Sequence, residues 1–195
     1  MGDSVTMGGH ERLVMATRAY RLLIARIVAP WALQGVRPDG EVLEIGGGVG
    51  AMAEHVVRSF PDVQMVETDF DPEMCAIASR NLRHFGSRVS VEQADANRLP
   101  FDDDKFDFVL SFLMLHHTGD WRQTLREAMR VLRPGGRLVG FDVVAGAPLH
   151  HPERFHTLMK RGELEEFLGT LRTAQDIRVR PGLAKTVVRF LASKS

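Results

Sequence analysis

An apolar strand that runs directly into a glycine loop is the first feature of this sequence with chemical potential. Residues 42–50 read Val-Leu-Glu-Ile-Gly-Gly-Gly-Val-Gly, and helix-forming residues follow. Glycine allows a tight turn and lets a ligand approach the backbone closely. Gly46-x-Gly48 alone is a weak signal, but the strand before it and the helix after it favour a nucleotide-type site at the carboxyl end of a sheet.

Acidic residues near the ends of three expected strands could serve such a ligand. Asp69 could hold a ribose, Glu44 could meet an ammonium group or order the loop, and Asp95 could accept a hydrogen bond from an adenine amino group. Each could instead be a turn, cap or solvated residue. The glycines also satisfy the dinucleotide pattern G-x-G-x-x-A, so NAD(P) stays open beside S-adenosylmethionine (SAM). Glu44, Asp95 and the expected lack of a second domain favour SAM.

Two adjacent histidines, His116 and His117, follow the fourth expected strand, where a second substrate would lie. Imidazole titrates near neutrality, so either ring could take a proton from an acceptor. Their alternative role is to shape the loop. A second group lacks tight ligand spacing, so we expect no metal there; it comprises His150, His151, Glu153 and His156.

The elements that must position these residues alternate along the chain. Strands are expected at 41–45, 63–67, 89–93, 106–112, 137–144, 177–180 and 186–192, and helices at 10–29, 51–59, 72–84, 121–132 and 163–171. This order predicts a doubly wound, Rossmann-like α/β sheet of seven strands, mainly parallel, with helices on both faces. The last two strands have only a short connection, so they should be antiparallel to each other.

We expect one domain over residues 1–195, with a flexible segment at 1–9, an N-terminal helical lid at 10–37 and the core fold at 41–195. The first helix should place apolar residues on one face, and Pro30 should end or kink it; these residues are Leu13, Ala16, Tyr20, Leu23 and Ile27. Packing on the edge of the domain and contact with a membrane surface remain alternatives to the lid.

Composition limits the classes of protein. The 25 basic and 25 acidic side chains balance, which argues against nucleic-acid binding driven by global charge. The single cysteine, Cys75, excludes an internal disulfide. No apolar run approaches the ~20 residues of a membrane span, and no signal-peptide layout is present. We therefore expect a cytoplasmic protein without an integral membrane segment; its oligomeric state is not predicted.

Five blocks in order resemble the class I SAM-dependent methyltransferase family, especially its small-molecule branch, which includes quinone-biosynthesis enzymes. The blocks are 44–50, 67–74, 94–101, 106–117 and 127–136. Gly47 departs from the family, which often carries Cys, Ser or Pro there. The loop after the fourth strand lacks the Asn/Asp-Pro-Pro-Tyr/Phe motif that marks methylation of amide or exocyclic amino nitrogen.

The resemblance implies a role for each matching residue. Gly46, Gly48 and Gly50 would lie against the methionine part of SAM, and Ser111 would line that end of the site. Asp69 would bind the ribose. Phe70 would pack on the adenine, while Asp95 and the Ala96 N–H would bind the adenine edge. The expected function is methyl transfer from SAM to a small-molecule or lipid acceptor by in-line displacement. A non-catalytic SAM-binding regulator and an NAD(P)-dependent oxidoreductase are the alternatives.

Overall fold

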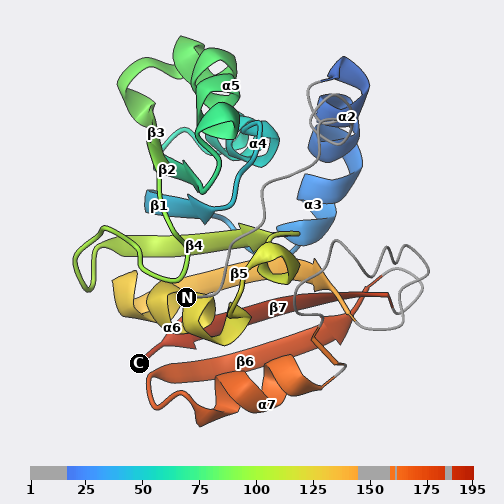
Figure 1. Cartoon of the computed structure of the whole chain (residues 1–195), viewed down its shortest axis with the longest axis vertical. Coiled ribbons are helices and arrows are strands. Elements are labelled where there is room, and N and C mark those ends of the chain that lie inside the picture. Colours follow the sequence, from blue (N-terminus) through green and yellow to red (C-terminus); the bar gives the residue numbers. More distant parts are fainter. Residues whose placement is uncertain (1–16, 145–158, 161, 183–185) are drawn as a thin grey trace.

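One seven-stranded sheet organises the molecule (Figure 1). The computed structural model describes residues 17–144, 159–160, 162–182 and 186–195. The strands are β1 (Gly40–Ile45), β2 (Val63–Asp69), β3 (Val89–Gln93), β4 (Phe106–Phe112), β5 (Leu132–Val143), β6 (Ala174–Pro181) and β7 (Val187–Lys194). Their order is β3-β2-β1-β4-β5-β7-β6, with β1 to β5 parallel and β7 antiparallel to both β5 and β6. The predicted fold class and the antiparallel closing strands are confirmed.

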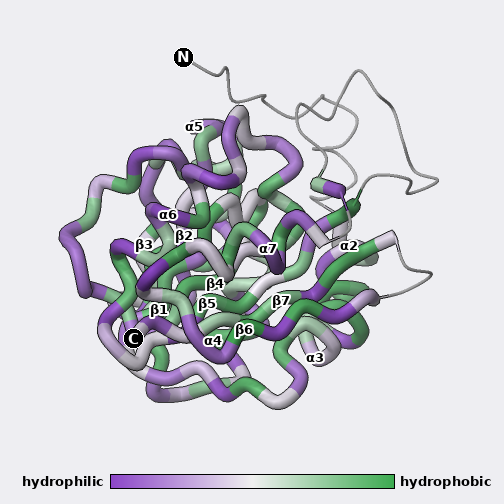
Figure 2. The backbone as a smooth tube through the Cα atoms, turned by 90° about the horizontal axis from the view of Figure 1, so that it is seen from below, coloured by the Kyte–Doolittle hydropathy of each residue, from purple (hydrophilic) through white to green (hydrophobic). Residues whose placement is uncertain are grey.

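Helices cover both faces of the sheet, and the alternation of side chains along each strand explains why. On β1, Val42 belongs to one apolar core and Leu43 to the other. The first core lies under α2 (Arg18–Leu23), α3 (Ala29–Ala32), α4 (Ala51–Ser59) and α5 (Pro72–Leu82), and the second under α6 (Trp121–Val131) and α7 (Glu163–Thr170). Figure 2 shows hydrophobic residues concentrated along the central strands.

The predicted start of α5 is confirmed. The Asp71 carboxylate accepts a hydrogen bond from the Glu73 N–H at 2.9 Å, and Pro72 occupies the first turn. Proline suits that position because the first helical N–H groups have no partner within the helix. A short 3₁₀ segment, η2 (Arg83–Arg88), leads from α5 to β3.

The fifth strand begins earlier than predicted. Residues 133–136, expected as a turn before the strand, lie inside β5 as an irregularity. Leu132 pairs with Phe106, and pairing resumes between Arg137 and Phe108. Three extra residues are therefore accommodated opposite Asp107, and Gly135 takes a left-handed conformation there with φ of +81°.

The apolar face predicted for the N-terminal helix is not the face that packs on the core, apart from Tyr20, which is partly buried against it. Ile24 is buried at 4% exposure, whereas Leu23 and Ile27 are 47% and 62% exposed. Pro30 does not end the helix, which passes through a π-helical segment, η1 (Ile24–Val28), into α3. The Ala29 N–H bonds to the Ile24 carbonyl. This wider turn accommodates a proline that lacks an N–H and crowds the preceding carbonyl, and it breaks the 3.6-residue period. Leu13 and Ala16 lie outside the described residues.

Candidate functional site

The carboxyl ends of four parallel strands meet at one edge of the sheet. Ile45 on β1 pairs with Thr68 on β2 and with Ser111 on β4, and Ser111 pairs with Gly140 on β5. The loops that follow these strands therefore lie side by side. This is the edge at which open α/β sheets bind ligands.

Asp69 ties the glycine loop to the end of β2. Its two carboxylate oxygens accept the Gly48 N–H and the Asp71 N–H, each at 2.9 Å. Gly48 has a φ of +60°, which favours glycine. Each oxygen keeps a second acceptor site, so both ribose hydroxyls could still be bound. Burial raises the pKa of Asp69.

Glu44 is buried beside the same loop, so its interpretation as a solvated strand-end charge is wrong. Burial raises the pKa of this carboxyl to about 8, although the Ala53 N–H bonds to it. Its Oε2 has no hydrogen-bond partner among the described residues. A buried carboxyl oxygen that lacks a donor suits an ammonium group, which carries both N–H donors and a positive charge, so this residue fits the expected cofactor.

The turns after β2 and β3 carry the expected adenine residues. Phe70 is 42% exposed, so it is not an ordinary core residue. Asp95 is exposed, and one of its oxygens accepts the Asn97 N–H at 2.9 Å, so part of its role is to shape its own turn. Ala96 is buried next to it, and the Ala94 N–H bonds to the Asp69 carbonyl at 3.0 Å.

A buried histidine–carboxylate pair lies at the exits of β4 and β5. His116, in η3 (Leu115–His117), places its Nδ1 2.5 Å from the Asp142 Oδ1. Asp142 is 0% exposed, and its other oxygen accepts the Leu115 N–H at 2.7 Å. The ring of His117 lies against that of His116, with centroids 4.0 Å apart.

Asp142 was missed by the sequence reasoning, although a signal existed. It is the one acidic residue of the otherwise apolar run 138–144, and it falls near the carboxyl end of β5. Because neighbouring parallel strands end at the same edge, a polar residue there is a candidate for the site.

The β4 exit also packs against the glycine loop. A Cβ on Gly46 would lie 2.7 Å from the Met114 Cβ, so glycine is required there by packing as well as by its φ of +68°. Leu113 has a φ of +53° and an exposed side chain. Such rarely populated conformations cluster at functional sites. Ser111 is buried, and its hydroxyl has no hydrogen-bond partner in the described part of the chain.

Several predicted features cannot be placed. Residues 1–9, most of the segment 145–161 and the second histidine group lie outside the described ranges. Within those ranges, no group of three or more His, Cys, Asp or Glu side chains could hold a metal ion. None of the described helices is long and apolar enough to cross a membrane.

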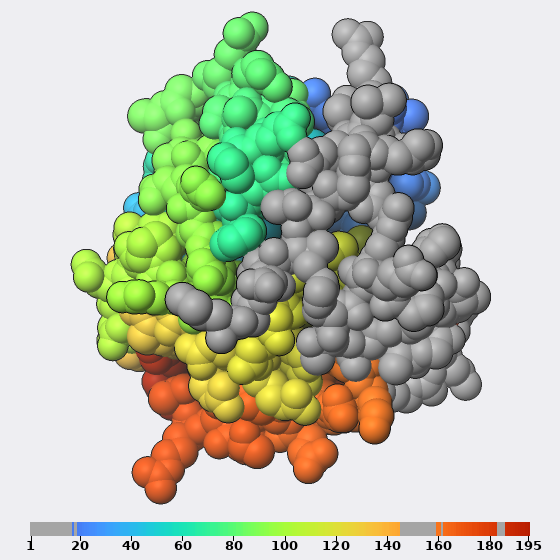
Figure 3. Space-filling view, in the orientation of Figure 1, coloured from blue at the N-terminus to red at the C-terminus, as the bar shows by residue number. Residues whose placement is uncertain are grey.

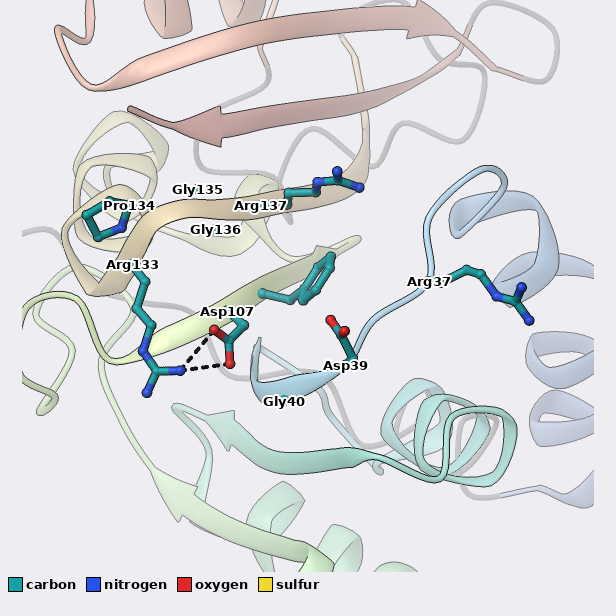
Figure 4. A pocket seen from close by; sticks show the side chains of 10 residues that line it. Arg37, Asp39, Gly40, Asp107, Arg133, Pro134, Gly135, Gly136 and Arg137 are labelled. Carbon is teal, nitrogen blue, oxygen red and sulfur yellow. Dashed lines mark hydrogen bonds and ion pairs between the residues drawn. The ribbon is translucent and has the colours of Figure 1, made fainter.

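A cavity of about 590 Å³ lies at the opposite, amino end of the strands (Figure 4). Asp107 accepts hydrogen bonds there from Arg133 at 2.8 and 2.9 Å and from the Glu41 N–H at 2.8 Å. Arg37 points away from this pair in Figure 4. The arginine side chains do not converge, and the geometry is that of an ion pair that holds β1, β4 and β5 together.

The strand order, the glycine loop after β1 and the carboxylate that closes it from β2 define a Rossmann-like, class I methyltransferase fold. Residues 43–140 match the family model described as "Methyltransferase domain", and the chain belongs to this family. The predicted family and its cofactor, SAM, are thereby confirmed, and NAD(P) loses support.

Named relatives narrow the resemblance. The chain is 33% identical over 147 residues to the ubiquinone/menaquinone biosynthesis C-methyltransferase UbiE of Desulfotalea psychrophila. The alignment covers 75% of this chain and 54% of that protein. It is 39% identical over 98 residues to the demethylmenaquinone methyltransferase of Thermus thermophilus, covering 50% and 44%. The chain thus spans about half the length of these curated relatives.

Solved structures share the fold. The PH0226 protein of Pyrococcus horikoshii OT3 superposes with a TM-score of 0.77 at 17% identity, covering 97% of this chain and 100% of that one. A SAM-dependent methyltransferase from Aquifex aeolicus gives 0.76 at 18% identity with the same coverage.

Proposed function

We propose that this chain transfers the methyl group of SAM to a small-molecule acceptor by in-line displacement, with His116 as general base. The buried His116–Asp142 pair carries the proposal, because it lies at the same edge as the glycine loop. A SAM-binding regulator needs the cofactor loop, but it has no use for a proton acceptor beside it.

SAM, when bound, supplies an electrophilic methyl group on a sulfonium whose departure as a neutral thioether needs no proton. The residues of the chain therefore have to orient the acceptor and take its proton where it carries one. Asp142 holds Nδ1 of His116, so it fixes the ring and would stabilise the imidazolium that forms when Nε2 accepts a proton.

The cofactor contacts remain a proposal built on this geometry. The residues that would hold SAM are Glu44, Gly46, Gly48, Gly50, Asp69, Phe70, Asp95, Ala96 and Ser111. The fit is supported by the free acceptor sites of Asp69, the unpartnered Glu44 oxygen and the exposed Phe70 ring. His117 is the second candidate base, because its ring lies against that of His116.

We propose a quinone-like or other lipid acceptor, because the curated relatives are named for quinone C-methylation. Deprotonation of a carbon acid or hydroxyl suits a general base. The N-terminal helix would act as a lid or touch the membrane that carries the acceptor. Its exposed Leu22, Leu23 and Ile27 support the second role. The single cysteine and balanced charge support a cytoplasmic location and no nucleic-acid partner.

The test starts with calorimetric titration of SAM and its demethylated product, with NAD and NADP in parallel, followed by an acceptor panel. His116→Ala should lower kcat by roughly 10²- to 10⁴-fold, the range typical of general base catalysis. Its SAM affinity should stay near that of the wild type. Transfer at the wild-type rate would remove His116 from the mechanism, and NAD binding without SAM binding would overturn the proposal as a whole.

A further inference from the structure

Glu67, inside β2, is a buried acid that the cofactor contacts above do not use. Its side chain is 0% exposed, and neither carboxyl oxygen has a hydrogen-bond partner among the described residues. An unpaired carboxyl is costly to bury, and its charged form more so. Its position therefore requires an explanation.

The Glu67 side chain fills the space under the glycine loop. A Cβ on Gly47 would lie 2.5 Å from its Oε1, 2.7 Å from its Cγ and 2.9 Å from its Cδ. Any side chain at position 47 would collide with this carboxyl. The glycine that departs from the family pattern is thus matched to a glutamate on the neighbouring strand.

The electrostatic surroundings of Glu67 are acidic. Glu44 pairs with it in register on β1, and Asp69 lies two residues further along the same face of β2. On the covering helices, Cys75 of α5 interacts with Glu67 and Asp69, and Tyr20 of α2 interacts with Glu44. Burial and then the two acids raise the pKa of Glu67 well above its usual range, which favours the protonated form of this carboxyl.

We infer that Glu67 is a positioning residue of the glycine loop. Glu67 releases its proton to solvent when the cationic cofactor binds on the other side of Gly47. The carboxyl O–H bond breaks, the proton passes to buffer, and the carboxylate stays under the loop. A positive charge above the loop favours the ionised form below it. By reciprocity, ionisation of Glu67 strengthens cofactor binding.

The proton count tests this inference in the full chain. SAM is titrated by calorimetry near pH 7 in buffers of different ionisation enthalpy, and the affinity is then measured from pH 6 to 8. We expect proton release and an affinity that rises with pH, by at most about tenfold per pH unit for one proton. Glu67→Gln should bind SAM but release fewer protons and show a flatter pH profile.

Two controls accompany that measurement. Glu41→Gln, at the other end of β1, should leave the proton count unchanged. The demethylated product lacks the sulfonium charge, so it should release fewer protons than SAM from the wild type. An unchanged proton count and pH profile in Glu67→Gln would overturn the inference while the proposed function stands. Absence of SAM binding in the wild type would overturn both.

A steric test is independent of protons. Gly47→Ser should weaken SAM binding by about tenfold or more, because the added atoms meet the Glu67 carboxyl. The double variant Gly47→Ser with Glu67→Ala should recover affinity to within a few fold of Glu67→Ala alone. Equal loss in both backgrounds would show that Glu67 does not fill the space under the loop.

Discussion

Asp69 and Asp142 have the same hydrogen-bonding arrangement at two ends of the candidate site. Each carboxylate receives a backbone N–H from an adjacent loop and keeps capacity for a second task. Asp69 holds the Gly48 N–H, and Asp142 holds the Leu115 N–H together with the His116 ring. Charge-assisted hydrogen bonds of this kind fix loop geometry before any ligand arrives.

Removal of the Asp69 carboxylate should therefore weaken SAM binding strongly. Hydrogen bonds to charged groups contribute about 1.5–3 kcal/mol each, so Asp69→Ala should lower affinity by at least about tenfold. Calorimetric titration gives the dissociation constant. Asp95→Ala serves as comparison and should lose less, because Asp95 is exposed and already bonds within its own turn. Wild-type affinity in Asp69→Ala would contradict the proposed ribose contact.

Glu44 should make stability depend on pH. Its pKa is raised from 4.5 to about 8, so the folded state binds a proton that the unfolded state has released between these values. The free energy of unfolding should be highest below pH 4.5 with respect to this group and fall as the pH rises to 8, by at most about 1.4 kcal/mol per pH unit.

Urea unfolding at pH 5, 6, 7 and 8 measures this dependence. Glu44→Gln should flatten the profile, since the amide does not titrate. Glu67 acts in the same direction, so some slope should remain in the single variant. A profile that rises over this interval in the wild type and is unchanged in Glu44→Gln would contradict the prediction.

At the scale of elements, the N-cap of α5 connects the turn after β2 to this helix. Asp71 bonds the Glu73 N–H and lies two residues after Asp69. Asp71→Ala should cost about 1 kcal/mol of stability, measured by chemical denaturation, because a helix N–H loses its acceptor. Asp71→Ser should retain most of that stability. Equal losses for both substitutions would show that the cap contributes little.

Most elements could be predicted from the sequence because their apolar period and their caps agree. The exceptions have local causes. The π-helical segment 24–28 shifts the buried face of the first helix, and no 3.6-residue pattern contains that shift. The start of β5 was missed because Pro134 and Gly135 indicate a turn, whereas here they lie within an irregular strand.

The candidate site was predictable where one loop carries its own signature. Glycines 46, 48 and 50 and Asp69 could be found because glycine loops and strand-end acids have recognisable spacing. Asp142 carried a positional signal, but the partners of Asp142 and Glu67 could not be assigned, because they lie in segments that follow other strands. His116 lies 26 residues from Asp142, and Gly47 lies 20 from Glu67. Register between strands, rather than local pattern, creates both pairs.

At the scale of the whole molecule, helices within each layer contact one another, but one layer leaves apolar side chains exposed. α6 and α7 contact each other through Trp121 and Phe167, whose ring centroids are 5.3 Å apart. Figure 3 shows their yellow and orange surfaces in contact. On the other layer, Leu22, Leu23 and Ile27 of the N-terminal helix remain exposed beside Arg26. This is the surface on which a membrane contact would rest.

Vesicle co-sedimentation tests that contact. Segment 12–38 contains five arginines and no acidic residue, so binding should increase with anionic lipid content. Ile27→Glu and Arg26→Glu should each reduce the bound fraction several-fold. Arg172→Glu, an exposed site at the end of α7, removes the same charge and should have little effect. Equal effects of Arg26→Glu and Arg172→Glu on the bound fraction would show that binding depends on net charge alone and not on this surface.

The only cysteine of the chain lies where its reactivity can report on local opening at the edge of the sheet that carries the candidate site. The Cys75 thiol lies 3.5 Å from the Asp69 carbonyl, half-buried, and burial raises its pKa to about 11. Such a thiol reacts slowly with alkylating reagents until the turn between β2 and α5 opens. The rate at which Cys75 is alkylated therefore reports the rate or extent of local opening. Intact-mass spectrometry can follow this reaction without any engineered label.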